Sequence, residues 1–86
     1  AEGVVNSAVG AGVTTANQFS AMVSLCFNIG ATNYRASSVL SEHLATHTQN
    51  AAAAFLLWNK AHIHGVLQPV AGLTARRTAE RDLYLS

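Results

Sequence analysis

The chain has 86 residues, of which half are apolar and a tenth are charged, and its formal net charge is +1. This length corresponds to one small domain, and the near-neutral charge excludes the basic face that nucleic-acid binding requires. Polar residues between Gly3 and Tyr34 interrupt every apolar run that is long enough to cross a membrane, so we expect no membrane span.

A first helix is expected within residues 1–11, because apolar residues gather on one side of it: Val4, Val5, Ala8 and Val9. Glycines in this segment weaken the helix, each by about 1 kcal/mol relative to alanine in a helix interior. A short link follows at residues 12–17.

The second predicted helix, residues 18–30, is the one around which the others are arranged. Its apolar residues recur at the i, i+3, i+4 spacing of one helix face: Phe19, Met22, Val23, Cys26, Phe27 and Gly30. Ala21 and Leu25 fall outside this stripe, so we expect neighbours on most sides of the helix. Asn17 is predicted to cap its start, and Gly30 to end it.

Three further segments follow the central helix. Residues 31–36 are predicted to be a loop, and Ser37 or Ser38 to cap a helix that reaches about Thr46. The inner side of that helix carries Val39, Leu40, His43, Leu44 and His47. Thr48 is predicted to cap the next helix, which shares one face among Ala51, Ala54, Phe55 and Trp58.

The C-terminal part is predicted as a loop and one helix. Residues 59–72 contain the only proline and two glycines, which favours a loop. The last helix, residues 73–85, should make contacts through Leu73, Ala79, Leu83 and Tyr84, with a polar surface formed by Arg76, Arg77, Glu80, Arg81 and Asp82. With no strand-like alternation, the prediction is an all-α fold: one domain, residues 1–86, with about five helices around a buried central helix.

Histidines and acids are the first candidates for chemistry. His43 and His47 stand four residues apart on a helix, and His62 and His64 follow, so a four-histidine zinc site is conceivable. Packed or hydrogen-bonded histidines are the preferred interpretation, and we predict no metal and no cofactor. The acids Glu2, Glu42, Glu80 and Asp82 form no readable catalytic pair, and Glu80, among arginines, should stay ionised in an ion pair.

Other side chains favour binding or packing. The single Cys26 excludes an internal disulfide and is predicted to be a small core residue. Trp58 and Asn59 would form a carbohydrate platform or, in the simpler interpretation, the end of an apolar helix face. Arg76 and Arg77 would either bind a carboxylate from elsewhere or remain surface charges.

Three blocks of the sequence resemble the phage-type lysozymes, the endolysins of glycoside hydrolase family 24. They are QFSAMVSLCFNIG at residues 18–30, FLLWNKA at 55–61 and GLTARRTAERDLY at 72–84, with a weaker fourth block, SSVL, at 37–40. Their order and spacing match the family's C-terminal helical lobe over nearly the entire chain.

The resemblance implies hydrolysis of the β-1,4 bond between N-acetylmuramic acid and N-acetylglucosamine in peptidoglycan. In the family, the catalytic Glu lies on an N-terminal lobe, with an Asp or Cys nine residues later, whereas here Glu2 and Glu42 are followed at that spacing by alanines. We therefore expect the N-terminal catalytic lobe to be absent from the chain, no catalytic residue within it, and no activity of the chain alone.

The resemblance also implies where a substrate would lie. The C-terminal lobe forms one wall of the cleft and orients the catalytic Glu, and the matching positions are Asn28, Trp58, Arg76 and Arg77. The implied partners are peptidoglycan, and the missing lobe or a second copy through exposed apolar surface. The implied setting is a phage or prophage protein that acts on the cell wall from the host cytoplasm or periplasm.

Two functions of other classes compete with this one. A non-enzymatic peptidoglycan-binding or virion-structural module would retain the same lobe. A membrane-perturbing helical protein would explain the charge-free segment from Gly3 to Tyr34, but the few basic residues disfavour it.

Overall fold

The computed structural model describes residues 1–86 and consists mainly of helices. The helices are α1 (Glu2–Val9), α2 (Ala16–Ile29), α3 (Ala31–Ala36), α4 (Ser38–Leu44), α5 (Thr48–Phe55) and α6 (Ala71–Leu85), with a 3-10 turn η1 (Leu56–Trp58) after α5. Two short strands, β1 (Lys60–Ile63) and β2 (Val66–Pro69), precede α6. The all-α prediction is confirmed for the body, and the hairpin is an addition to it.

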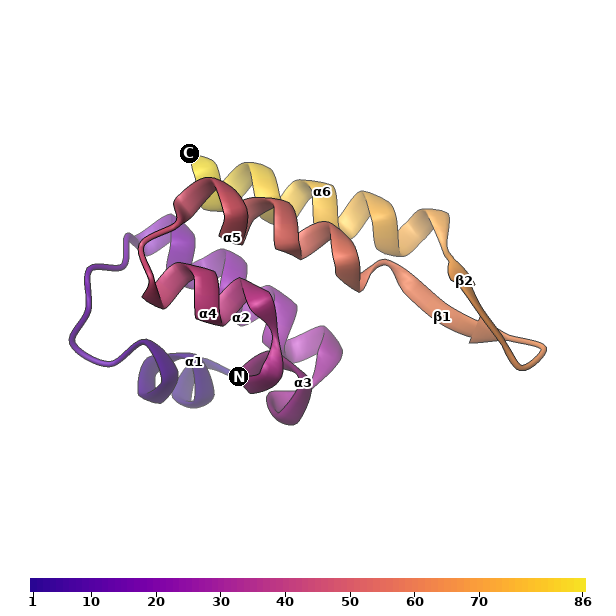
Figure 1. Ribbon diagram of the computed structural model, residues 1–86, viewed down its shortest axis with the longest axis horizontal. Coiled ribbons are helices and arrows are strands. Elements are labelled where there is room, and N and C mark those ends of the chain that lie inside the picture. The colour runs from indigo at the N-terminus through magenta and orange to yellow at the C-terminus, as the bar shows by residue number, and fades with distance from the viewer.

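The helices form a layered body from which the hairpin extends. Figure 1 shows α5 and α6 along one side, α2 and α4 in the middle, and α1 and α3 on the opposite side. The molecule measures 42 × 24 × 18 Å, and the hairpin projects from one end of its long axis (Figure 1). None of the helices combines the length and apolar character that crossing a bilayer requires.

Helix α2 is central, as predicted, but its buried face differs from the predicted stripe. The fully buried residues are Ala21, Met22, Leu25 and Cys26, whereas Phe27 is 78% exposed. Both sides of α2 are apolar enough to be buried, so the position of α6 rather than the spacing decided which side faces inward. Cys26 is a free, buried core residue, as expected.

The ends of the helices follow local chemistry. Thr15, not Asn17, caps α2: its side chain accepts from the Gln18 backbone N–H, while the Gln18 side chain accepts from the Thr15 N–H. Gly30 ends α2 with φ 89°, in the left-handed region that favours glycine. Ser37 caps α4 as predicted, whereas His47 rather than Thr48 precedes α5 and provides no side-chain cap.

Two predicted loops are regular structure. Residues 31–36 form α3, which buries Tyr34 completely, so this short segment is held by packing of the tyrosine into the core. Residues 60–69 form the antiparallel hairpin, with Ile63 paired to Val66 across the His64-Gly65 turn. Both turn residues have positive φ, 50° and 78°, as a two-residue hairpin turn requires.

The prediction of which side of α6 is buried is wrong in part. Arg77 and Glu80, expected on the polar surface, are buried, whereas Ala79 and Leu83, expected as contacts, are exposed. Tyr84 is buried as predicted. On α4, Val39, Leu40 and His43 face inward, but Leu44 does not, and His47 lies beyond the end of α4 and is exposed.

Candidate functional site

A buried ion cluster joins α2 to α6. Glu80 is 5% exposed, and Arg77 is completely buried. The Arg77 Nη2 donates to Glu80 Oε2 at 3.1 Å, and the Arg77 Nε lies 2.7 Å from Oε1 as an ion contact without an aligned hydrogen bond. The hydroxyl of Ser24 on α2 also donates to Glu80 Oε2. The predicted ion pairing of Glu80 is therefore confirmed.

The other edge of the Arg77 guanidinium faces the end of α2. Its Nη1 donates to Asn28 Oδ1 at 3.0 Å and more weakly to the backbone oxygen of Trp58 at 3.4 Å. Because Glu80 holds one edge of the rigid, planar group, the direction of Nη1 is fixed. Three of the four predicted site residues, Asn28, Trp58 and Arg77, are thus brought together by one guanidinium.

Arg76 occupies a different position from Arg77. It is 39% exposed, and its Nε donates to Glu80 Oε2 at 3.3 Å. Its Nη2 donates to the backbone oxygen of Ser24 at 3.2 Å. Arg76 therefore closes the solvent side of the cluster and does not reach Asn28 or Trp58 by a hydrogen bond.

Burial and charge act in opposite directions on the cluster. Desolvation lowers the pKa of Arg77 from its ordinary value, and the charge and hydrogen bond of Glu80 raise it, while the charge of Arg76 lowers it. An arginine remains a cation in proteins, so Arg77 and Glu80 form a charged buried pair. Removal of either partner would leave the other charge uncompensated.

Asn28 and Trp58 line a hollow of about 340 Å³ where the hairpin leaves the body. Its other lining residues are Ile29, Asn33, Lys60 and Leu73, from α2, α3, β1 and α6. This volume is in the range of small-molecule sites, and the lining is half apolar with a few polar groups, as such sites are. It is the candidate functional site.

Asn33 and Lys60 are members of this site that the sequence did not identify. A signal existed for Asn33: it follows Gly30 by less than one helical turn, so it lies beside the C-terminal end of α2. Ser24, the partner of Glu80, lies one helical turn before Asn28 on α2. Its side chain lies on the same side of that helix as Asn28.

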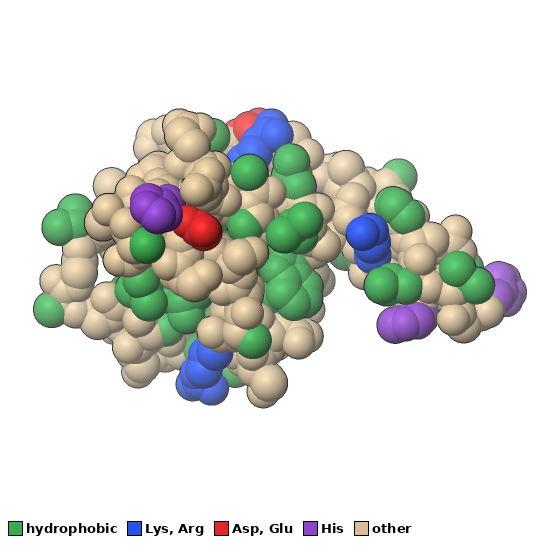
Figure 2. All heavy atoms as spheres, viewed as in Figure 1, with side chains coloured by type: hydrophobic (Ala, Val, Ile, Leu, Met, Phe, Trp, Pro, Cys, Tyr) green, Lys and Arg blue, Asp and Glu red, His purple; other side chains and the backbone are tan.

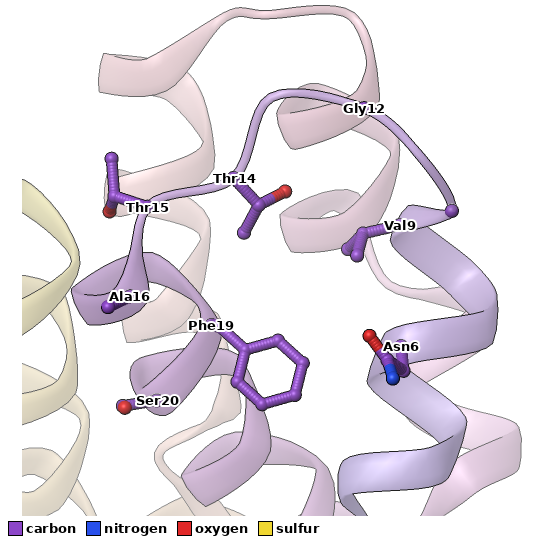
Figure 3. A pocket seen from close by; sticks show the side chains of 9 residues that line it. Asn6, Val9, Gly12, Thr14, Thr15, Ala16, Phe19 and Ser20 are labelled. Atoms are coloured by element: carbon purple, nitrogen blue, oxygen red, sulfur yellow. The ribbon is translucent and has the colours of Figure 1, made fainter.

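A larger hollow lies elsewhere, between α1 and α2. It measures about 560 Å³, and its lining includes Asn6, Val9, Thr14 and Phe19. Figure 3 shows the Phe19 ring directed into the space between the two helices, below the chain that connects them. None of the predicted site residues lines this hollow, so its size does not make it the functional site.

The histidines are spread over the molecule and serve different purposes. His43 is buried: its Nδ1 lies 2.6 Å from the Tyr84 hydroxyl and its Nε2 2.9 Å from Thr14 Oγ1. His47 pairs with Glu42 on the surface, and His62 and His64 lie on the hairpin. Figure 2 shows histidine side chains at both ends of the molecule. The four histidines considered as a zinc site therefore do not converge.

The acids are also separated from the hollow. Glu42 contacts His47, Asp82 contacts Arg81 at 3.0 Å, and Glu80 lies within the ion cluster. None of them lines the hollow beside Asn28 and Trp58. The site as formed by this chain is one of polar amides, an indole and a lysine.

Comparisons with known proteins show which family this chain is similar to. The family model described as phage lysozyme matches residues 1–80. An endolysin of Acyrthosiphon pisum secondary endosymbiont phage 1 is 40% identical over 72 residues, which are 84% of this chain and 49% of the relative. The chain thus spans about half the length of this relative.

Solved structures of similar proteins also match nearly all of this chain and little more than half of their own length. The muramidase domain of SpmX from Asticaccaulis excentricus superposes with a TM-score of 0.90 at 35% identity, over 99% of this chain and 57% of that one. An endolysin from Escherichia coli O157:H7 phage FAHEc1 gives a TM-score of 0.85 at 34% identity, over 98% and 57% of the two chains. The family match, the sequence identity and the common fold together show that this chain belongs to the phage lysozyme family.

Proposed function

We propose that these residues work as the C-terminal helical lobe of an endolysin that hydrolyses the β-1,4 bond between N-acetylmuramic acid and N-acetylglucosamine in peptidoglycan. The observation that carries the proposal is that Asn28 and Trp58 line one hollow, and that the buried Arg77 guanidinium donates to both residues. The endolysins and the muramidase domain that the chain resembles support the choice of substrate.

In this proposal, the hollow is one wall of a substrate cleft, and the catalytic Glu belongs to another lobe. Asn28 and Trp58 contact the glycan, and Arg77 acts through Asn28 because its own guanidinium is completely buried. Arg76 is half-buried and closes the ion cluster on its outer side. Phe27, exposed beside Asn28, would be covered by the other lobe or by a second copy.

The same proposal includes a setting. A protein of this kind is encoded by a phage or prophage and acts on the bacterial cell wall, reached from the host cytoplasm or periplasm. The endolysins of phages among the relatives support a phage origin.

A complementation assay tests the proposal. The 86-residue chain alone should not reduce the turbidity of a peptidoglycan suspension. Mixed with the N-terminal half of the endolysin from Acyrthosiphon pisum secondary endosymbiont phage 1, it should restore lysis. The Trp58→Ala variant should restore far less, while Leu57→Ala, an exposed neighbour, should behave like the unchanged chain. Lysis by the chain alone would contradict the proposed division of work between lobes.

A non-enzymatic peptidoglycan-binding module is the second candidate. The observation that favours it is that the hollow is formed entirely by this chain and contains no acid. A pull-down on purified cell wall that depends on Trp58, together with failed complementation, would favour this candidate over the first.

A further inference from the structure

We propose that the connection between α1 and α2, residues 10–15, is a site of limited proteolysis. The cut falls at the Val13–Thr14 bond and suits an endopeptidase with a small aliphatic specificity pocket. The contact between Thr14 and His43 restrains it. This segment lies apart from the candidate site, so the inference goes beyond the proposed function and does not depend on it.

Val13 is the exposed centre of this connection. Its side chain is 95% exposed, and neither its backbone N–H nor its backbone oxygen forms a hydrogen bond within the chain. Gly10, with φ 59°, and Gly12 precede it, and glycine restricts the backbone least. Figure 1 shows the connection as an open loop at one end of the helical body. A protease binds its substrate through extended backbone, and an exposed loop with free backbone groups provides it.

The side chains of the connection select the class of endopeptidase. Ala11 and Val13 are small and aliphatic, and the segment contains no lysine, arginine or aromatic residue. The specificity pocket of elastase is small and accepts such side chains, whereas that of trypsin holds an aspartate for a basic side chain. In the reaction, water cleaves the peptide bond, so that Val13 carries the new carboxylate and Thr14 the new amine.

Exposure alone does not make such a site, as the hairpin illustrates. Val66 is aliphatic and 59% exposed, but its strand is paired with β1, where Val66 lies opposite Ile63. The ladder engages the backbone groups of both strands. An endopeptidase would have to open the hairpin before it could bind Val66, whereas Val13 needs no such opening of secondary structure.

The side chain of Thr14 fastens the connection to the body. Its Oγ1 lies 2.9 Å from His43 Nε2, and the other ring nitrogen of His43 lies 2.6 Å from the Tyr84 hydroxyl. His43 and Tyr84 are both buried, so the core fixes their positions. Thr14 directly follows the bond to be cut, and an endopeptidase can seat that bond only when Thr14 leaves His43. The rate of cleavage therefore depends on how often this hydrogen bond opens.

The cut detaches α1 from the rest of the chain. α1 packs against α2 and α4, and Val5 and Val9 are its two buried residues. A free helix of this length is not stable in water, and without the connection α1 is no longer held at a high local concentration beside α2. The fragment of residues 1–13 should therefore dissociate, so the cut removes part of the core.

Digestion of the 86-residue chain with pancreatic elastase tests the site. At a low ratio of enzyme to substrate, mass spectrometry should identify residues 1–13 and 14–86 as the first products, before any product of cleavage at Val66. Size-exclusion chromatography should separate the two fragments. Trypsin at the same ratio should cleave more slowly, because every lysine and arginine of the chain lies in a helix or in the hairpin.

Val13→Lys is the decisive variant. Because Val13 is 95% exposed, the change should leave the far-UV circular dichroism spectrum unaltered. Elastase should no longer cut this bond, and trypsin should cut after residue 13 before any other site. Val66→Lys makes the same change at an exposed position of the hairpin, and residue 66 should not become the first trypsin site.

His43→Leu tests the restraint without changing the residues that the protease binds. Elastase should cleave the Val13–Thr14 bond about two- to tenfold faster, the factor that corresponds to one neutral hydrogen bond, with no increase at other sites. His47→Leu, which breaks the surface pair with Glu42, should leave the rate unchanged.

A first elastase cut at Val66 or within a helix, resistance of the connection to elastase, or trypsin resistance of Val13→Lys at residue 13 would each overturn the proposed site. An unchanged rate in His43→Leu, or a rise at every site together, would overturn the restraint. Co-elution of the two fragments would overturn the detachment of α1.

Discussion

Helix α6 carries two buried polar clusters of opposite character. Near its middle, Arg77 and Glu80 form a charged pair with Ser24 and Asn28 of α2. Near its end, Tyr84 forms a neutral pair with His43 of α4, which in turn contacts Thr14. The first cluster adjoins the hollow with Asn28 and Trp58, and the second lies at the other end of α6.

The difference between the clusters has a physical reason. When one partner of a buried ion pair is removed, the other charge remains buried without compensation. When one partner of a neutral hydrogen bond is removed, the loss in the free energy of unfolding is smaller. The charged cluster fixes the orientation of the Asn28 amide, because Glu80 holds the Arg77 guanidinium that donates to Asn28. The neutral cluster joins three segments, and we expect it to respond to mild acid, because burial lowers the pKa of His43.

The largest expected effect is that of Arg77→Met. The variant keeps an unbranched apolar stem but leaves the buried Glu80 charge without its main partner, so the free energy of unfolding should fall by about 3–5 kcal/mol. Urea denaturation followed by circular dichroism measures it. Arg81→Met, which breaks the surface pair with Asp82, should change it by less than about 1 kcal/mol.

A double variant sharpens this result. Arg77→Met combined with Glu80→Leu removes both buried charges and should be more stable than Arg77→Met alone. If the double variant were less stable by the full sum of the two single effects, the uncompensated charge would not be the cause of the loss.

Tyr84→Phe should have a smaller effect. It removes the hydroxyl 2.6 Å from His43 Nδ1 and leaves that ring nitrogen without its partner. The free energy of unfolding should therefore fall by about 1–2 kcal/mol. Tyr34→Phe is the matched control, because the Tyr34 hydroxyl donates only to the sulfur of Met22 at 3.4 Å. A larger loss in Tyr34→Phe than in Tyr84→Phe would contradict the role assigned to the neutral pair.

The smallest expected effect is the response to pH. Burial lowers the pKa of His43, so below about pH 6.5 the unfolded chain binds more protons at this residue than the folded chain does. Stability should therefore fall as the pH drops through this value and stop falling below the pKa of the folded state.

Denaturation midpoints between about pH 7.5 and pH 5.5 measure this response. His43→Gln should flatten the dependence, whereas His47→Gln, at a surface pair with Glu42, should keep most of it. A dependence that persists in His43→Gln would assign the acid response to another group.

The sequence predicted well those features that depend on neighbouring residues. The first helix, the central helix and the end of α2 at Gly30 follow from spacing and glycine chemistry, and the cap of α4 at Ser37 follows from its hydroxyl. The hairpin was missed although a signal was present, since Ile63 and Val66 flank a two-residue turn that contains glycine. His64 in place of Asn or Asp made that signal weak.

The site was predicted only in part. The resemblance indicated Asn28, Trp58 and Arg77, and the structure places them together. Burial of Arg77 and Glu80 was not predicted, because all five charged residues of α6 lie in one short polar stretch of the sequence and only these two are buried. The choice between Leu25 and Phe27 as the buried residue of α2 was likewise decided by the helices around it.

By itself, the sequence determined a helical domain of the phage lysozyme type, the positions of most helices and two of the residues that line the candidate site, Asn28 and Trp58. These features depend on residues within a few positions of one another, and on motifs. Tertiary structure alone decided which charges are buried and which way the Asn28 amide points, because the contacts that decide both join distant parts of the chain. Asn28 and Arg77 are 49 positions apart, and Ser24 and Glu80 are 56 positions apart. Local spacing contains no information on such pairs, since they exist only when α2 and α6 pack together.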